Sequence, residues 1–341
     1  MKEIWFSLCY FILLMSASVA VANDFSGVVQ TIEKSYVSIE FSPSANERKT
    51  IGSSTKPDEL MKKLLEGRQN KRGTTKGSGF FIDNQGYLIT SFNTVSSSGE
   101  IWISTHDGFR HKGTFVGGDE SLDLSVIKIN STDYPGVTFS EDFTLGESVA
   151  VLSNHTELKN TLSSGIISHL PQVNALSAPF PMLQADTAID LGSAGSPLFN
   201  RKGEVLGMVS AAIIINHKFA GQAFAIPTKS LMRFLPNLKS TGKINRASLG
   251  IAGGDVWLDV SSDRQQKYVI ISEVMSGSAA DKAGLEVGDF IVDFNGTKVS
   301  DWWHFIGMVA LAEPMKDYSL TIQRNGKNKK VMVTLLPLKD D

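Results

Sequence analysis

The residues best placed to do chemistry lie in one small-residue turn between two strand-like segments. The run 184–199 contains Gly192–Ser196, whose sequence is Gly-Ser-Ala-Gly-Ser. A turn of such small residues lets two backbones approach closely and can aim several N–H groups at one point. Backbone donors arranged in this way stabilise an oxyanion. The turn therefore predicts an oxyanion-hole-like site formed by the backbone of Gly192 and Ala194.

This turn resembles the active-site loop of the HtrA family of trypsin-like serine proteases. The family loop reads Asp-x-Ala-Ile-x-x-Gly-Asn-Ser-Gly-Gly-Pro-Leu, and Gly192, Gly195, Pro197 and Leu198 match it here. The nucleophilic serine of the family is replaced by Ala194, and a methyl group cannot attack a carbonyl carbon. The same stretch therefore indicates the fold and predicts that the usual chemistry is missing.

A protease of this kind also needs a base and a carboxylate that orients the base. The family motif Leu-Thr-Asn-x-His-Val-Val aligns with residues 88–95 and places Asn93 at the histidine position. An amide cannot accept a proton at neutral pH, and none of the six histidines lies within ten residues of Asn93. The motif Asp-Leu-Ala-Val-Leu-Lys-Ile keeps its aspartate, as Asp123. We predict that Asp123 bonds nearby backbone or the Asn93 amide.

Two other serines, Ser193 and Ser196, flank the empty nucleophile position. Neither has a base beside it in the sequence, and an alcohol without a base is a weak nucleophile. We predict that both are turn residues that bond local backbone. Whether the chain is an enzyme stays open. One hypothesis is a natural pseudoprotease, and the alternative is a serine endopeptidase whose nucleophile has been substituted in this sequence or which uses an unusual constellation.

The pattern along the chain predicts a mainly β protein. From Gly77 onward, short alternating segments are separated by regular turns such as 83–86 and 107–108, which is typical of a barrel or sandwich. A capped helix at 228–235 closes this part. The family resemblance implies a trypsin-like double antiparallel β-barrel over 23–236, with the active site between the barrels.

A second pattern follows a polar linker, predicted at 237–245. The run 277–296 resembles the PDZ signature Gly-Ser-x-Ala-x-x-Ala-Gly-Leu-x-x-Gly-Asp-x-Ile-x-x-x-Asn-Gly, and it predicts a PDZ domain over 246–338. PDZ domains bind a peptide C-terminus as an added strand, with the carboxylate on backbone N–H groups of a short loop. By resemblance that loop contains Leu249, Gly250 and Ile251, and helix residues near 304–308 shape the pocket.

The N-terminus predicts export. An apolar run from Ile4 to Ala22 ends in Ala-Val-Ala, which fits a signal peptide at 1–22, and an uncleaved membrane anchor is the alternative. The only cysteine, Cys9, lies in that run, so the mature chain has no disulfide and no cysteine-ligated metal. We expect a periplasmic protein, or one anchored in the inner membrane and facing the periplasm.

Charge and composition exclude several other functions. The formal net charge is −2, which gives no argument for nucleic-acid binding. No histidine pair has the helical spacing of a zinc motif, so neither a metal nor a cofactor is expected. The polar segment 42–76 is rich in lysine and arginine. It is interpreted as a solvated insertion, with a basic docking site as the alternative.

These observations predict an exported, HtrA-like protein that binds protein or peptide C-termini through its PDZ domain. It would act as a scaffold, a chaperone-like binder or a regulator in envelope protein quality control. Candidate partners are active HtrA-family relatives and, in a homotrimer, further copies of this chain. The membrane is a partner only if the N-terminal segment is uncleaved.

Overall fold

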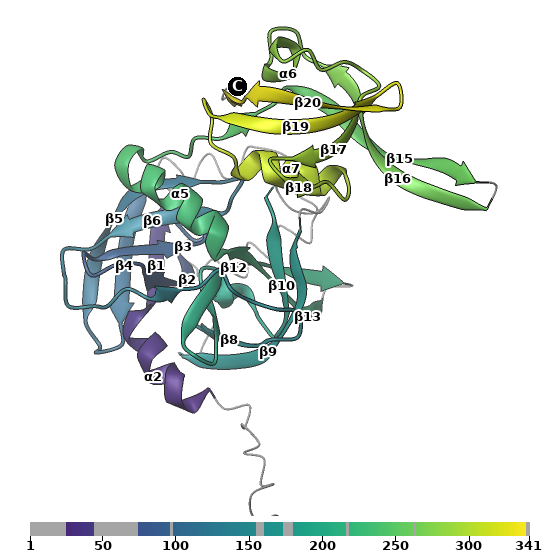
Figure 1. Ribbon diagram of the computed structural model, residues 1–341. Helices are drawn as coiled ribbons and strands as arrows, with labels where there is room; N and C mark the ends of the chain where they lie inside the picture. Colours follow the sequence, from purple (N-terminus) through teal and green to yellow (C-terminus); the bar gives the residue numbers. More distant parts are fainter. Residues whose placement is uncertain are drawn as a thin grey trace, which may run out of the picture.

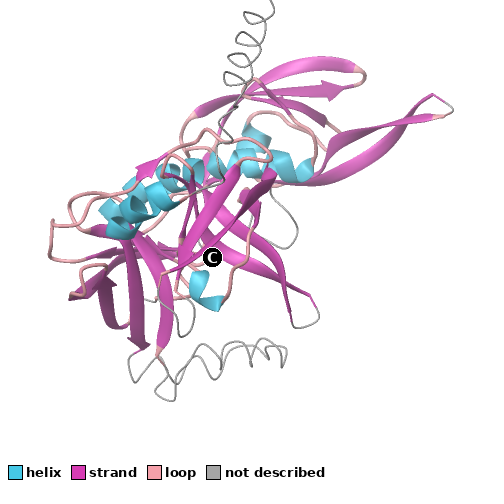
Figure 2. Cartoon of the chain, turned by 90° about the horizontal axis from the view of Figure 1, so that it is seen from below, coloured by secondary structure: helices cyan, strands magenta, loops and turns pink. Residues whose placement is uncertain are grey.

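The computed structural model describes residues 25–43, 74–95, 98–154, 160–172, 180–215, 218–261 and 263–338. The predicted signal peptide and most of the segment 42–76 lie outside these ranges. The prediction of a mainly β protein, with a trypsin-like double barrel followed by a PDZ domain, is confirmed (Figures 1 and 2). Among the described ranges, none of the helices has the length and apolar character needed to cross a bilayer.

The first barrel is closed and follows helix α2 (Ser26–Ser35). Its strand order is β1-β2-β3-β6-β5-β4, and β1 closes the barrel by pairing antiparallel with β4. On β4, Ile101 and Ile103 are buried while Trp102 between them is partly exposed, as the period of two predicts. The strands are β1 (Tyr36–Pro43), β2 (Thr75–Phe81), β3 (Tyr87–Thr90), β4 (Gly99–Thr105), β5 (Arg110–Asp119) and β6 (Leu124–Lys128).

The second barrel is a seven-stranded sheet in the order β11-β8-β9-β10-β13-β12-β7, and the additional pairing of β11 with β12 joins the sheet to itself. A short helix, η1 (Leu191–Ser193), leads into β11 and carries the small-residue turn. The strands are β7 (Thr138–Phe139), β8 (Ser148–Ser153), β9 (Thr161–Gln172), β10 (Met182–Asp186), β11 (Pro197–Asn200), β12 (Glu204–Ile215) and β13 (Lys218–Pro227).

Helix α5 (Thr228–Thr241) is longer than the sequence indicates. The predicted helix stops at 235, before Pro236, and 237–245 is predicted as linker, but the helix continues through the proline. Leu238 is fully buried in the next turn, and burying a leucine contributes about 1.5–3 kcal/mol, which helps to offset the hydrogen bond that proline removes. The helix ends at Gly242, whose φ of 74° is the left-handed cap that glycine favours.

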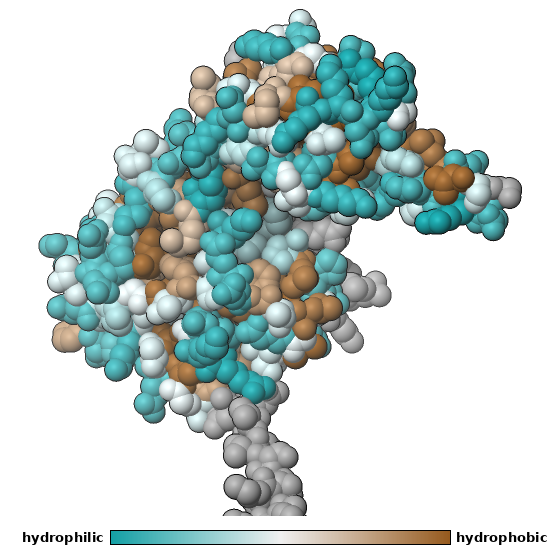
Figure 3. Space-filling view, in the orientation of Figure 1, coloured by the Kyte–Doolittle hydropathy of each residue, from teal (hydrophilic) through white to brown (hydrophobic). Residues whose placement is uncertain are grey.

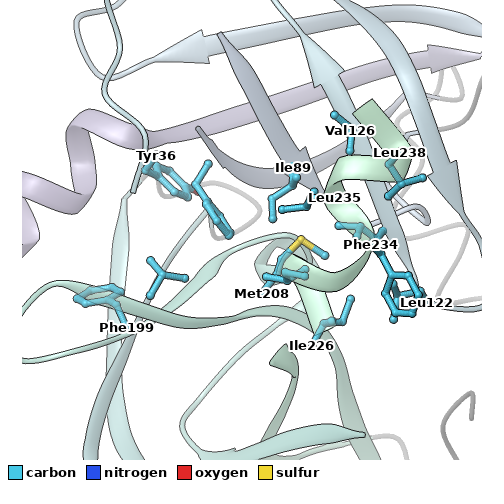
Figure 4. Close-up of a cluster of buried hydrophobic side chains, with 14 of the residues drawn as sticks. Tyr36, Ile89, Leu122, Val126, Phe199, Met208, Ile226, Phe234, Leu235 and Leu238 are labelled. Atoms are coloured by element: carbon cyan, nitrogen blue, oxygen red, sulfur yellow. The ribbon is translucent and has the colours of Figure 1, made fainter. Parts of the chain in front are cut away.

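The largest hydrophobic core lies where the two barrels and α5 meet (Figure 4). Phe234, Leu235 and Leu238 of α5 pack there together with Val126 of the first barrel and Met208 of the second. Because this core draws on both barrels, it fixes their relative position. The loops at the end of each barrel are thereby held against one another.

The PDZ domain has its own core. Its main sheet runs β15-β16-β17-β19-β20, and β14 pairs separately with β21. The hairpin of β15 and β16 projects from the domain and carries exposed apolar residues at 257, 258 and 260 (Figures 1 and 3). The elements are β14 (Ala247–Ser248), β15 (Ile251–Ser261), β16 (Arg264–Val274), α6 (Ala279–Lys282), β17 (Phe290–Phe294), β18 (Thr297–Lys298), α7 (Trp302–Leu311), β19 (Asp317–Arg324), β20 (Lys327–Thr334) and β21 (Leu336–Pro337).

The PDZ domain is joined to the first part of the chain by specific contacts. Arg233 of α5 donates from Nε to the Leu311 carbonyl oxygen at 3.1 Å and from Nη2 to that of Ala312 at 2.9 Å. Arg246 forms an ion pair with Asp119 of β5. A cavity of about 680 Å³ lies between α7 and the second barrel. These bonds place the end of α7 on the double-barrel domain.

A buried ion pair inside the PDZ domain predicts how its stability depends on pH. Asp289 is 1% exposed and accepts from Arg324 Nε at 2.6 Å and Nη2 at 2.7 Å. Burial raises the pKa of the Asp289 carboxyl, but the hydrogen bonds from Arg324 and the Glu286 N–H outweigh it and hold the pKa below its ordinary value. The stabilisation is therefore present above the unfolded-state pKa of about 4 and is lost as the pH falls through the folded-state value.

We expect Asp289→Asn to lower the free energy of opening of the PDZ domain by about 2 kcal/mol at pH 7, as for other charged hydrogen bonds. The difference from wild type should shrink as the pH falls below about 4 and should vanish only below the lowered folded-state pKa, where the wild-type carboxyl is protonated too. Amide hydrogen exchange at residues 246–338 measures it. Glu286→Gln is the control, because this exposed carboxylate bonds the same arginine and its loss should change little. An equal effect of both substitutions would contradict the assignment.

Candidate functional site

Three loops meet where the first barrel faces the second. Asn93 follows β3, Asp123 directly precedes β6, and Ala194 lies between η1 and β11. The Ser78 N–H donates to the Ala194 carbonyl oxygen at 3.1 Å, which holds the small-residue turn on β2. Gly195 has a φ of 88°, and a Cβ there would lie 2.1 Å from the Ser78 carbonyl oxygen. Only glycine permits so close an approach.

Asp123 is the centre of a hydrogen-bonded cluster. Its Oδ1 accepts from Ser91 Oγ at 2.6 Å, from Asn93 Nδ2 at 2.8 Å and from the Asn93 N–H at 3.0 Å. Its Oδ2 accepts from Ser210 Oγ of β12 at 2.6 Å. Asp123 is only 8% exposed, and a buried carboxylate needs such partners. The cluster therefore joins the two barrels through one carboxylate.

The contact between Asn93 and Asp123 is the one that the sequence analysis expected for this pair. Asn93 is exposed on its other side, and its amide nitrogen donates to the carboxylate. A histidine in this position would present a second ring nitrogen that can accept a proton, whereas an amide has no group that titrates near neutral pH. Asn93 can hold Asp123 in place, but it cannot serve as a general base.

The turn at Ala194 is closed by a local capping arrangement. The Gly192 N–H donates to Asp190 Oδ1 at 2.9 Å, and the Asp190 N–H donates to Ser193 Oγ at 3.1 Å. Gly192 is one of the two predicted oxyanion-hole donors. In this structure its N–H group bonds the Asp190 carboxylate, so an incoming oxyanion would have to displace a negative group from it.

Ser193 and Ser196 stay within the turn. Ser193 Oγ donates to Asp190 Oδ1 at 3.1 Å and is 1% exposed. Ser196 is fully buried, and its hydroxyl has no hydrogen-bond partner among the described residues. Neither hydroxyl contacts a described base. The predicted bond to local backbone is present for Ser193, which accepts from the Asp190 N–H, but the prediction is wrong for the Ser196 hydroxyl among the described residues.

Three of the four histidines that the structure describes form hydrogen bonds elsewhere, and the His106 ring lies edge-on to the Tyr134 ring. His111 Nε2 bonds the Tyr134 hydroxyl at 2.8 Å on the first barrel. His169 Nδ1 bonds the Leu170 carbonyl oxygen at 2.6 Å, and His304 Nδ1 bonds Ser300 Oγ at 3.0 Å. His155 and His217 lie outside the described residues. Within the described ranges, no histidine hydrogen-bonds the Asp123 cluster.

Sequence reasoning missed three polar residues of this site. Ser78 is fully buried and bonds the Tyr36 hydroxyl at 2.8 Å, the Asn154 N–H at 3.2 Å and the Gly192 carbonyl oxygen at 2.8 Å. Ser91 and Ser210 were missed because serines on strands and turns are common. The only sequence signal was that Ser91 lies two residues before Asn93, directly after β3.

The predicted carboxylate loop of the PDZ domain is tightly built. The Leu249 carbonyl oxygen accepts from the Ala280 N–H at 2.9 Å, and that of Gly250 accepts from the Met275 N–H at 3.0 Å. Gly250 has a φ of 73°, and a Cβ there would lie 2.3 Å from the Ser278 Cβ. Ile251 then begins β15, an edge strand that pairs on one side with β16. Such an edge can accept an added strand.

The predicted pocket residues near 304–308 divide between two surfaces. His304, Gly307 and Met308 line the cavity between α7 and the second barrel, together with residues of β9 and α5. Ile306 does not line this cavity and packs against the PDZ core, which Met308 contacts as well. Within the described part of the chain, no group of three or more histidine, aspartate or glutamate side chains could hold a metal ion.

Two parts of the chain match known protein families, and they correspond to the double-barrel domain and the PDZ domain of the fold. Residues 77–208 match the trypsin-like peptidase domain, and residues 256–335 match the PDZ domain. The carboxylate loop at 249–251 precedes the matched PDZ range. Two families therefore account for most of the described residues, in the order that the sequence predicts.

Similar proteins are named as proteases. A probable periplasmic serine endoprotease DegP-like of Hahella chejuensis is 32% identical over 289 residues, which is 81% of this chain and 60% of the relative. One of Chlamydia trachomatis is 31% identical, over 80% of this chain and 56% of the relative. The chain thus spans little more than half the length of these relatives. The solved structure of the HtrA-type protease AlgW with tripeptide has a TM-score of 0.71 at 20% identity, covering 93% of this chain and 98% of that one.

Proposed function

Because this chain has the domain plan of the HtrA family, a trypsin-like peptidase domain followed by a PDZ domain, we propose that it works by binding protein C-termini and not by cleaving peptide bonds. The observation that carries the proposal is the Asp123 cluster. Its carboxylate holds an asparagine amide where catalysis needs an imidazole, next to a turn that has Ala194 at the nucleophile position.

Both chemical roles are missing at once. Ala194 has no atom that can form an acyl-enzyme, and Asn93 has no group that can take a proton. A single substitution at either position would already inactivate a protease of this class, so the loss of both favours a protein selected for another role. The N–H group of Gly192 also supports the proposal, because this predicted oxyanion donor already donates to the Asp190 carboxylate.

The binding role rests on the PDZ domain. Leu249, Gly250 and Ile251 form a constrained loop at the start of an edge strand, which is the arrangement by which a peptide end adds to a sheet. The peptide-bound state of the similar structure AlgW supports peptide binding by this architecture. The ligand class that we propose is a protein or peptide with a free, apolar C-terminus.

The alternative is a serine endopeptidase whose nucleophile is substituted in this sequence. The relatives are named serine endoproteases, so their names support this alternative better than they support a binding protein. Sequencing the native gene at codons 93 and 194 separates the two hypotheses. Serine at 194 with histidine at 93 would establish the alternative, and asparagine with alanine would support the proposal.

The names of the same relatives support a periplasmic compartment for this chain. Their names place them in the periplasm, which supports the export predicted from residues 1–22. In that compartment the chain would act as a scaffold, a chaperone-like binder or a regulator in protein quality control. Active HtrA-type relatives and a homotrimer of this chain are the assemblies that we propose to look for by pull-down from the envelope.

A titration tests the binding function directly. The chain without residues 1–22 is titrated with one hydrophobic peptide as the free acid and as the C-terminal amide. The amide loses the charge and one acceptor, and charge-assisted hydrogen bonds contribute about 1.5–3 kcal/mol, so we expect at least about tenfold weaker binding. Equal affinities, or no binding across a C-terminal peptide library, would refute the proposal and shift attention to the segment 42–76.

A further inference from the structure

One face of β15 is directed at α7 through three alternating residues. Side chains at positions i, i+2 and i+4 of a strand share a face. Here Ile251 packs with the PDZ core, Gly253 lies beneath the Trp302 ring, and Asp255 reaches the start of α7. The space between the edge of β15 and α7, where an added strand would lie, is therefore bounded by different groups along its length.

The Trp302 ring lies directly on the backbone of β15. A Cβ at Gly253 would be 2.6 Å from Cζ3 of Trp302 and 3.0 Å from Cη2. The Ile270 carbonyl oxygen of β16 would be closer still, at 2.3 Å, so both the neighbouring strand and the indole require glycine at this position. Trp302 is partly buried, and its ring centroid is 6.0 Å from that of the fully buried Phe305. The ring is thus held in place from the core side of the domain.

Asp255 fastens the same end of α7 to the strand. Its Oδ1 accepts from the Trp302 N–H at 2.7 Å, and its Oδ2 lies 3.8 Å from Lys267 Nζ of β16. The helix is also capped by its own Asp301, which accepts from the His304 N–H at 2.8 Å. A free N–H at a helix start needs a partner, so the Asp255 contact satisfies a group that would otherwise be exposed.

The register of a bound peptide follows from where its carboxylate is held. The loop 249–251 precedes β15, so a peptide that ends there runs antiparallel to the strand. Its last residue then lies opposite Ile251, the next opposite Ala252, and the third opposite Gly253. Directly opposite residues share a face, so the third side chain from the end points at the Trp302 ring.

We propose that Trp302 and Asp255 together close the far end of the peptide groove, so that the domain reads about the last three residues of a protein chain and requires a small side chain at the third. This inference rests on the proposed binding function. The last peptide residue lies opposite Ile251, which packs against the PDZ core, and the side chain of the second residue from the end points to the other face of the sheet. Residues further from the carboxylate meet the contact between Asp255 and Trp302 and leave the groove.

The test uses four acetylated peptides with free carboxylates and the chain without residues 1–22. Three share the ending Ala-Val-Phe and are a tripeptide, a hexapeptide and a decapeptide, and the fourth is a decapeptide that ends in Phe-Val-Phe. We expect the first three to bind within about threefold of one another and the fourth at least about tenfold more weakly. A decapeptide that binds about tenfold or more tightly than the tripeptide would overturn the closed groove while leaving the binding function intact.

Two variants distinguish the effect of the Trp302 ring on peptide binding from a general disturbance of α7. Trp302→Ala should restore binding of the Phe-Val-Phe peptide to within about threefold of the Ala-Val-Phe decapeptide. Trp303→Ala is the matched control, because Trp303 is 40% exposed on the same helix, and it should change nothing. If binding of the Phe-Val-Phe peptide recovers in both variants, or in neither, the inference is wrong. Failure of every free-acid peptide to bind wild type and Trp302→Ala would refute the binding function itself.

Discussion

Replacing Ala194 with serine alone is expected to leave the protein unable to cleave casein, whereas Asn93→His with Ala194→Ser is expected to restore cleavage. The serine by itself stays protonated, because the residue that the Asp123 carboxylate holds at the base position is Asn93, whose amide cannot accept a proton. A histidine at 93 would replace the amide that now donates to Asp123 at 2.8 Å, and the carboxylate would then orient its ring. General-base catalysis contributes about 10²–10⁴-fold, so we expect the double variant to exceed the single one by at least about a hundredfold.

Fluorophosphonate labelling is a control for this comparison of variants, because it detects an activated serine without a protein substrate. Wild type and Asn93→His should not label, and the double variant should. The bond from the Gly192 N–H to Asp190 should keep the double variant below a complete enzyme, since loss of one oxyanion donor costs about 10²–10³-fold. Labelling of wild type that disappears in Ser193→Ala or Ser196→Ala would show that another serine is the nucleophile. Robust turnover by Ala194→Ser alone would point to a base that this structure does not place at the site.

Gly250→Val is expected to remove peptide binding, with a fall in affinity of about tenfold or more. The residue has a φ of 73°, and the added Cβ would lie 2.3 Å from the Ser278 Cβ, so the loop must move to relieve the contact. The loop is also tied by the Met275 N–H to the Gly250 carbonyl oxygen, so a displacement moves the donors that would face the carboxylate. A titration with a hydrophobic free-acid peptide measures the loss.

Gly277→Val is the matched control for this variant. Gly277 has nearly the same φ, 74°, but a Cβ there meets nothing within 4 Å. Both variants carry the same backbone strain, and only the first has the clash inside the carboxylate loop. An equal loss of affinity in the two variants would mean that the effect is a general destabilisation of the PDZ domain.

The sequence alone was sufficient to predict the fold and to propose that the usual catalytic chemistry is missing. Three local features indicate the fold: the period of two in the strands, the small-residue turn at 192–196 and the signature at 277–296. Each depends on the residue types within a short stretch, so it can be recognised without knowledge of the tertiary contacts. That Ala194 and Asn93 cannot act as nucleophile and base follows from their functional groups, whatever surrounds them.

Only the tertiary structure decided how those residues are used. Ser210 lies 87 residues from Asp123 along the chain, yet its hydroxyl bonds that carboxylate, because the core around α5 holds the barrels together. Helix α5 passes through Pro236 because Leu238 is buried against both barrels, which a propensity argument cannot anticipate. The Trp302 ring on Gly253 depends in the same way on packing between a helix and a strand that are 49 residues apart in the sequence, so it is visible only in the folded chain.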